Sequence, residues 1–153
     1  MQIPTAVDLP AGTSPKQLGV PVSIEIGGKG RRPALVVIQG FTTCSEVPPP
    51  LSDCTSKVCR LIRKALLRSC VQRSVVSALA AAGPPAGTLV VTRTLKKKVG
   101  RSTRPVQGTL RLNKLGRSLL QQSTTLPLES RAAIRDRGGS TLTALFRTLL
   151  RLR

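Results

Sequence analysis

The densest group of side chains that could do chemistry is the basic run KKKVGRSTR, residues 96–104, which carries five positive charges. Lysines and arginines in such a run can bind the charged groups of a polyanion, with an affinity that falls steeply as salt rises. A solvated β-turn region of a basic protein can carry the same run. We predict seven candidates for polyanion binding: Lys96, Lys97, Lys98, Arg101, Arg104, Arg111 and Arg117.

The positive charge is concentrated in the last two thirds of the chain. Of the 25 lysines and arginines among the 153 residues, 21 lie in residues 57–153, together with only two of the six carboxylates. The net charge of +19 therefore belongs to this part, and such a charge attracts nucleic acid, anionic lipid or acidic polysaccharide. The two aromatic residues, Phe41 and Phe146, offer almost no platform for stacking nucleic-acid bases.

Four cysteines are the next group with defined chemistry: Cys44, Cys54, Cys59 and Cys70. Their spacing lacks the close C-x2-C pairs of a structural zinc site, so we predict no metal. An even number of cysteines in an exported chain favours disulfides, and buried free thiols are the alternative. If residues 57–70 form one helix, Cys59 and Cys70 lie about 16 Å apart along its axis and cannot pair. Cys44 with Cys54 would then be the natural bridge.

The inventory of catalytic groups is poor. Histidine is absent, and the six carboxylates are scattered singly along the chain: Asp8, Glu25, Glu46, Asp53, Glu129 and Asp136. A catalytic site needs acid, base or nucleophilic groups that converge, and no pairing of these carboxylates suggests acid and base roles. We therefore expect neither an enzyme nor a cofactor.

Several segments alternate between apolar and polar residues with the period of two that is typical of half-buried strands. They predict strands at 20–26, 88–95, 108–113, 126–136 and 141–153, and the apolar run at 34–39 predicts a second, more fully buried strand. Asp136 and the Gly138–Gly139 pair supply the turn chemistry that joins the last two as a hairpin. We expect an extended or loosely ordered entry over the first twenty residues, a loop over 41–56, a basic loop over 96–105, and a single helical turn within 113–122.

A different periodicity marks residues 57–82, where we predict an amphipathic, basic helix, although the pattern weakens after Cys70 and VQRSVVSAL could equally form a strand. Ser56 can cap its start, and Gly83 followed by two prolines can end it. Apolar residues recur at helical spacing, and four cations share the opposite face: Lys57, Arg60, Lys64 and Arg68. Such a helix packs on a core with its charges in water, or else lies on a membrane surface or a partner.

Three motifs in the second half carry a resemblance to a known family. They are GTLVVTRTLKKKVGRS, GTLRLNKLGRSLL and LPLESRAAIRDRGGSTLTALFRTLLRLR, and the positions that carry the resemblance are Gly87–Leu89, Leu110–Leu120 and Leu126–Arg153. This pattern resembles the immunoglobulin-like β-sandwich modules repeated in secreted and surface proteins of high-GC Gram-positive bacteria. The resemblance implies a non-catalytic structural or adhesive module that acts outside the cell.

Together these observations predict a mainly β protein with an immunoglobulin-like sandwich in its C-terminal part and a short amphipathic helix before it. We expect an extended or β region with a Pro- and Cys-containing loop at 1–56, the helix at 57–82 and the sandwich-like domain at 83–153. The expected function is a structural or adhesive module whose cationic face binds acidic polymers or cell-surface components. The alternative is a small, basic nucleic-acid-binding protein, viral or accessory, that contacts phosphates independently of base sequence.

Each of the two expected functions implies a different cellular location. The start of the chain shows no basic segment followed by an apolar run, and no span of about 20 apolar residues occurs, so we predict neither a signal peptide nor a transmembrane segment. The protein is secreted or at the cell surface if it belongs to a longer exported chain, and intracellular, in nucleus or nucleoid, under the alternative. A third reading is an overprinted frame whose product barely folds, because Trp, Tyr and His are absent.

Overall fold

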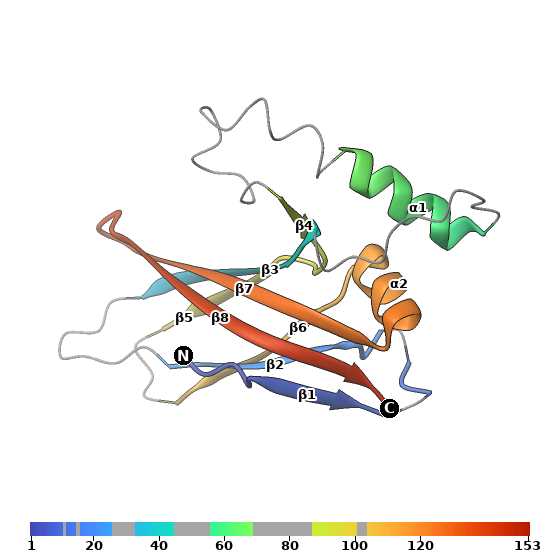
Figure 1. The fold of residues 1–153 in the computed structure, drawn as a ribbon. Helices are drawn as coiled ribbons and strands as arrows, with labels where there is room; N and C mark the ends of the chain where they lie inside the picture. Colours follow the sequence, from blue (N-terminus) through green and yellow to red (C-terminus); the bar gives the residue numbers. More distant parts are fainter. Residues whose placement is uncertain (11, 15, 26–32, 45–55, 69–86, 101–103) are drawn as a thin grey trace.

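The computed structural model describes residues 1–10, 12–14, 16–25, 33–44, 56–68, 87–100 and 104–153. In these residues the chain is mainly β, as expected, with eight strands and two short helices. The strands form a larger and a smaller sheet, and α1 and α2 lie together at one end of the molecule (Figure 1). Both sheets combine strands from residues 1–56 with strands from residues 83–153.

The larger sheet has the order β1-β8-β7-β3-β4, and β5 pairs with β3 on the same edge as β4. The pair β1–β8 is parallel, and the other neighbours are antiparallel. Its strands are β1 (Ala6–Leu9), β3 (Ala34–Thr43), β4 (Thr88–Val90), β5 (Leu95–Val99), β7 (Thr125–Asp136) and β8 (Thr141–Leu152). The smaller sheet pairs β2 (Gly19–Ile24) with β6 (Val106–Arg111) in antiparallel fashion.

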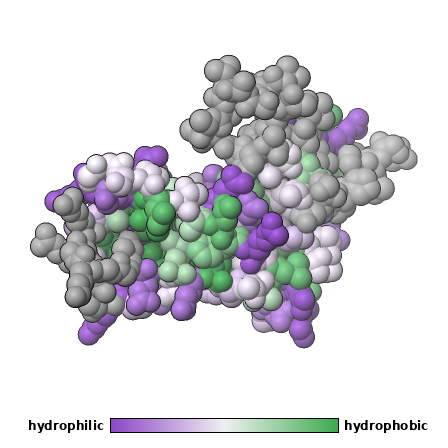
Figure 2. Space-filling view, turned by 60° about the vertical axis from the view of Figure 1, so that its left-hand side comes forward, coloured by the Kyte–Doolittle hydropathy of each residue, from purple (hydrophilic) through white to green (hydrophobic). Residues whose placement is uncertain are grey.

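The core lies between the two sheets because each strand turns its alternate, apolar side chains inward. The smaller sheet contributes Val20, Val22, Ile24 and Leu110, and the larger sheet contributes Val36, Ile38, Leu126, Leu128, Ala132 and Leu150, all in one buried cluster. These are the faces that the alternation predicts for β2, β6, β7 and β8. Strand β3, expected to be more fully buried, instead buries only alternate residues over 34–40. Some hydrophobic residues also reach the surface, where they lie between hydrophilic margins on the face seen in Figure 2.

The predicted hairpin of β7 and β8 is confirmed. The backbone N–H of Gly139 donates to Asp136 O at 3.2 Å, and the Asp136 carboxylate accepts from the N–H of Ser140 at 3.0 Å. Of the two turn glycines, Gly139 has the positive φ, +84°. The left-handed conformation that the reversal requires is therefore supplied by Gly139 alone.

Gly139→Val is expected to lower the free energy of unfolding by about 2 kcal/mol, because a β-branched side chain is strained at positive φ. Chemical denaturation measures this loss. Gly139→Asn is the matched control, since asparagine tolerates the left-handed region, and it should keep most of the stability. Equal stability of the valine variant and the wild type would contradict the role of this φ angle.

Helix α1 (Lys57–Leu66) begins where expected. The Ser56 hydroxyl accepts a hydrogen bond from the backbone N–H of Cys59 at 3.1 Å, so the predicted cap is confirmed. Ile62 is buried and the four predicted cations of the opposite face are exposed. The rest of the predicted helix, residues 69–82, lies outside the described residues.

The single helical turn expected within residues 113–122 is wrong, because a three-turn helix, α2 (Lys114–Ser123), occupies this segment. The Asn113 side chain caps it by accepting the N–H of Gly116 at 2.8 Å. Leu119 and Leu120 are buried in the core. The helix is therefore stabilised by the Asn113 cap, which is a local signal, and by tertiary packing, which short local patterns do not reveal.

The basic loop expected at 96–105 is also wrong over its first part, because Lys96, Lys97 and Lys98 lie on strand β5. This strand pairs with β3, which places Lys98 beside Leu35 and Lys96 beside Val37. Lysine is disfavoured in strands, but on an edge its charge stays in water while its stem covers apolar neighbours.

Two further strand segments lie outside the predicted strands, one in the entry expected to be extended or loosely ordered and one in the expected loop. Ala6–Leu9 forms β1 and pairs with the end of β8, while Phe41, Thr42 and Thr43 continue β3 rather than beginning a loop. Both segments become strands because a neighbouring strand offers a free edge, which is a tertiary effect rather than a local preference.

Candidate cationic site

Arg93 and Arg111 lie directly opposite each other on adjacent segments. Thr92 and Leu112 form an isolated antiparallel bridge, and the backbone N–H of Arg93 donates to Arg111 O at 2.8 Å. Both side chains are exposed, and neither forms an ion pair with a carboxylate in the part of the chain that the structure describes. Like charges placed directly opposite each other are destabilising in a sheet.

Lys97 approaches this arginine pair from β5. Successive side chains of a strand point to opposite faces, and Lys97 shares its face with Leu95, toward β6. A Cβ on Gly108 of β6 would lie 3.1 Å from the Leu95 side chain and 3.3 Å from Cε of Lys97. The absence of a side chain at Gly108 therefore leaves room for the lysine stem to cross the strand.

Arg117 approaches the pair from α2, whose start is held rigidly. The Asn113 side-chain amide donates to Val90 O at 2.8 Å, and its backbone N–H donates to Val91 O at 2.9 Å. These bonds anchor the first turn of α2 beside the segment that carries Arg93. Arg117 is half-buried, so part of its position is determined by packing.

These side chains line two pockets that share Arg93 and Arg111. One, of about 450 Å³, is lined by Arg93, Thr94, Leu95, Lys97, Gly108, Thr109 and Arg111. The other, of about 230 Å³, is lined by Lys16, Arg93, Arg111, Leu112 and Arg117. We call the two together the cationic groove; it has five cations, and its lining residues include no carboxylate.

The structure brings together three of the seven predicted polyanion-binding residues in this groove: Lys97, Arg111 and Arg117. Lys96 and Lys98 point to the other face of β5, Arg104 is exposed, and Arg101 lies outside the described residues. Sequence reasoning missed Lys16 and Arg93. Arg93 becomes a neighbour of Arg111 through the bridge between Thr92 and Leu112, and no local pattern signals that pairing.

Three of the four described carboxylates have ion-pair or hydrogen-bond partners outside the groove. Glu129 pairs with Arg131 at 2.9 Å, and the Arg131 guanidinium lies 5.8 Å from the centre of the Phe41 ring. Asp8 pairs with Arg153 at 3.2 Å, and Asp136 holds the hairpin turn. Among the described residues no group of three or more Cys, Asp or Glu is placed to hold a metal ion.

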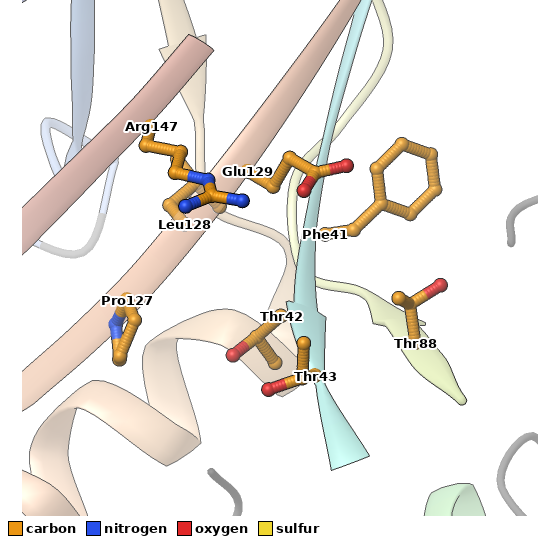
Figure 3. A pocket seen from close by; sticks show the side chains of 8 residues that line it. All are labelled: Phe41, Thr42, Thr43, Thr88, Pro127, Leu128, Glu129 and Arg147. Atoms are coloured by element: carbon orange, nitrogen blue, oxygen red, sulfur yellow. The ribbon is translucent and has the colours of Figure 1, made fainter. Parts of the chain in front are cut away.

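A third pocket, of about 260 Å³, lies where β3, β4, β7 and β8 meet (Figure 3). Glu129 and Arg147 lie opposite each other on β7 and β8 along one wall, and Thr42, Thr43 and Thr88 line another. The Thr42 hydroxyl is buried and has no hydrogen-bond partner among the described residues. With one carboxylate and one guanidinium, this pocket lacks the excess of positive charge that a polyanion requires.

The cysteines are only partly described. Cys44 follows β3 and Cys59 lies in α1, and both are disulfide-bonded. Cys54 and Cys70 lie outside the described residues, so the bridge between Cys44 and Cys54 stays a prediction.

Comparison with protein-family models, curated proteins and solved structures finds no match to this chain. The function must therefore be argued from the groove itself. Neither helix in the described segments has the length and apolar character needed to span a membrane.

Proposed function

We propose that the protein is a non-catalytic structural or adhesive module, built as an immunoglobulin-like sandwich, whose cationic groove binds acidic polymers of a cell wall or surface. The opposed pair of Arg93 and Arg111 carries this proposal. The pair costs stability in the free protein, and an anion placed between the two guanidinium groups would convert repulsion into two charge-assisted hydrogen bonds.

The shape of the groove supports a polymer rather than a single small anion. Its two pockets meet at Arg93 and Arg111, so a chain that places one anionic group there can place others beside Lys97 and Arg117. The threonines of the larger pocket, Thr94 and Thr109, add hydroxyls that suit the alcohol groups of a sugar. Acidic polysaccharide is therefore the class of ligand we favour.

Nucleic acid is the alternative partner. Phosphates would bind the same cations without base readout, but no aromatic residue lines the groove, so single strands would lack stacking. A pocket of about 230 Å³ also suits one charged group that projects from a slender chain better than it suits the width of a duplex.

The test is a titration of the protein with a heparin decasaccharide at several salt concentrations. We expect the affinity to fall by about 100-fold or more between 50 and 200 mM NaCl, because roughly five cations release counterions. Neutral dextran of similar length should not bind. The absence of heparin binding at 50 mM NaCl would contradict the proposal, and tighter binding of a short DNA duplex would favour the alternative.

A further inference from the structure

A second cationic pocket, of about 460 Å³, lies near the turn between β7 and β8. It is lined by Pro33, Ala34, Leu35, Lys98, Val99, Gly100, Arg135, Asp136 and Arg137. Leu35 of β3 pairs with Lys98 on one side and with Arg135 on the other, so the two cations flank an apolar floor. We call this site the Lys98 pocket.

The charge balance of the Lys98 pocket also favours an anion. Three cations surround one carboxylate, that of Asp136, which accepts the backbone N–H of Ser140 at 3.0 Å. A second hydrogen bond of the hairpin turn runs from the N–H of Asp136 to Ser140 O at 3.2 Å and fixes the backbone of Asp136. Arg135 and Arg137 are its neighbours along the chain. Positive charge therefore dominates the opening.

The cationic groove and the Lys98 pocket lie on opposite faces of β5. Lys97 lines the groove and Lys98 lines the second pocket, and consecutive residues of a strand point to opposite sides. The groove also extends to α2, whereas the Lys98 pocket lies at the hairpin turn, and Figure 1 shows these elements at opposite ends of the molecule. A short acidic chain bound in one site therefore lies on the other side of β5 from the second site.

We propose that the Lys98 pocket is a second site for the anionic groups of an acidic polysaccharide, and that one molecule bridges two polymer chains. This inference rests on the proposed function of the groove. The alternation of β5 thereby divides two of its three lysines, Lys97 and Lys98, between two binding sites. Bridging would make the protein a cross-linker of acidic polymers rather than a protein that binds a single polymer chain.

Bridging can be measured with the full-length protein on a surface coated with heparin. The surface is saturated with protein and washed, and fluorescent heparin of about ten sugar units is added at low salt. A protein with two sites should capture the labelled chain. In solution, titration with a heparin hexasaccharide should give two bound molecules for each protein monomer, with the monomeric state checked by sedimentation.

Three double variants that change the net charge equally distinguish loss of the Lys98 pocket, loss of the cationic groove and a general effect of charge. Lys98→Glu with Arg135→Glu should still bind the coated surface through the groove but capture at least tenfold less labelled heparin. Arg93→Glu with Arg111→Glu should show the same loss of capture, by removing the other site. Lys57→Glu with Lys64→Glu, on the exposed face of α1, should behave as the wild type. Thermal melting of each variant establishes that it is folded.

The outcomes distinguish this inference from the proposal on which it depends. Capture by the Lys98 and Arg135 variant at the wild-type level would overturn the second site, as would a stoichiometry of one hexasaccharide per monomer. Failure of the wild-type protein to bind the coated surface at all would instead contradict the function proposed for the groove.

Discussion

Gly116→Ala is expected to lower the free energy of unfolding by about 2–3 kcal/mol, with a fall in melting temperature of about 5–10 °C. A Cβ at this position would overlap the carbonyl oxygen of Val91 and lie 3.2 Å from the Leu112 side chain. The overlap is with backbone, which cannot move aside as the end of a flexible side chain can. Although alanine favours helix over glycine by about 1 kcal/mol, the displacement of α2 should outweigh that gain.

The matched control for this prediction is Gln121→Ala, an exposed position on the same helix. It adds a helix-favouring alanine without a clash and should change the unfolding free energy by about 0.5 kcal/mol or less. Chemical denaturation of both variants measures the difference. If Gly116→Ala were as stable as the control, the close contact between α2 and the Val91 segment would not exist in solution.

The same variant should also weaken heparin binding. Gly116 precedes Arg117, and the cap formed by Asn113 anchors both to the segment that carries Arg93. Displacement of the first turn of α2 would move Arg117 away from the arginine pair. We therefore expect the geometry of the groove to depend on Gly116, although this residue has no side chain that could bind a ligand.

Arg93→Glu is expected to weaken heparin binding by about 30-fold at 100 mM NaCl while the protein becomes slightly more stable. The new carboxylate would repel the polymer, and it would face Arg111, turning a like-charge pair into an attractive one. Such a cross-strand pair contributes about 0.2–1 kcal/mol. Affinity and stability should therefore change in opposite directions, which a merely structural role for Arg93 does not predict.

The control for this prediction is Lys57→Glu, which changes the net charge equally at the start of α1, where a negative charge is favourable. It should reduce affinity by less than about threefold, since it acts only through the overall field. Titration with the heparin decasaccharide and thermal melting test both variants. Equal loss of affinity in the two would show that net charge alone, rather than the groove, determines binding.

The local patterns of the sequence determined a large part of the fold. Alternation predicts β2, β6, β7 and β8, because burial on one face of a strand requires apolar residues at every second position, and a continuous apolar run predicts the first part of β3. Ser56 and the residues of the β7–β8 turn predict a helix start and a reversal for equally local reasons. Composition also determines the strong positive charge, whatever the fold.

Only the tertiary structure decided which cations meet. From the sequence alone, residues 96–98 are expected to lie in a solvated loop. In the structure they form part of β5, which pairs with the edge of β3, and this pairing places Lys97 and Lys98 on opposite faces. Strand β1 and helix α2 likewise form because distant residues cover them. Arg93 and Arg111 are 18 residues apart and become neighbours through the pairing of Thr92 with Leu112. Neither arginine side chain contributes to that pairing. The physical reason is that each arginine is compatible with any exposed position, so its own sequence context carries no information about its partner.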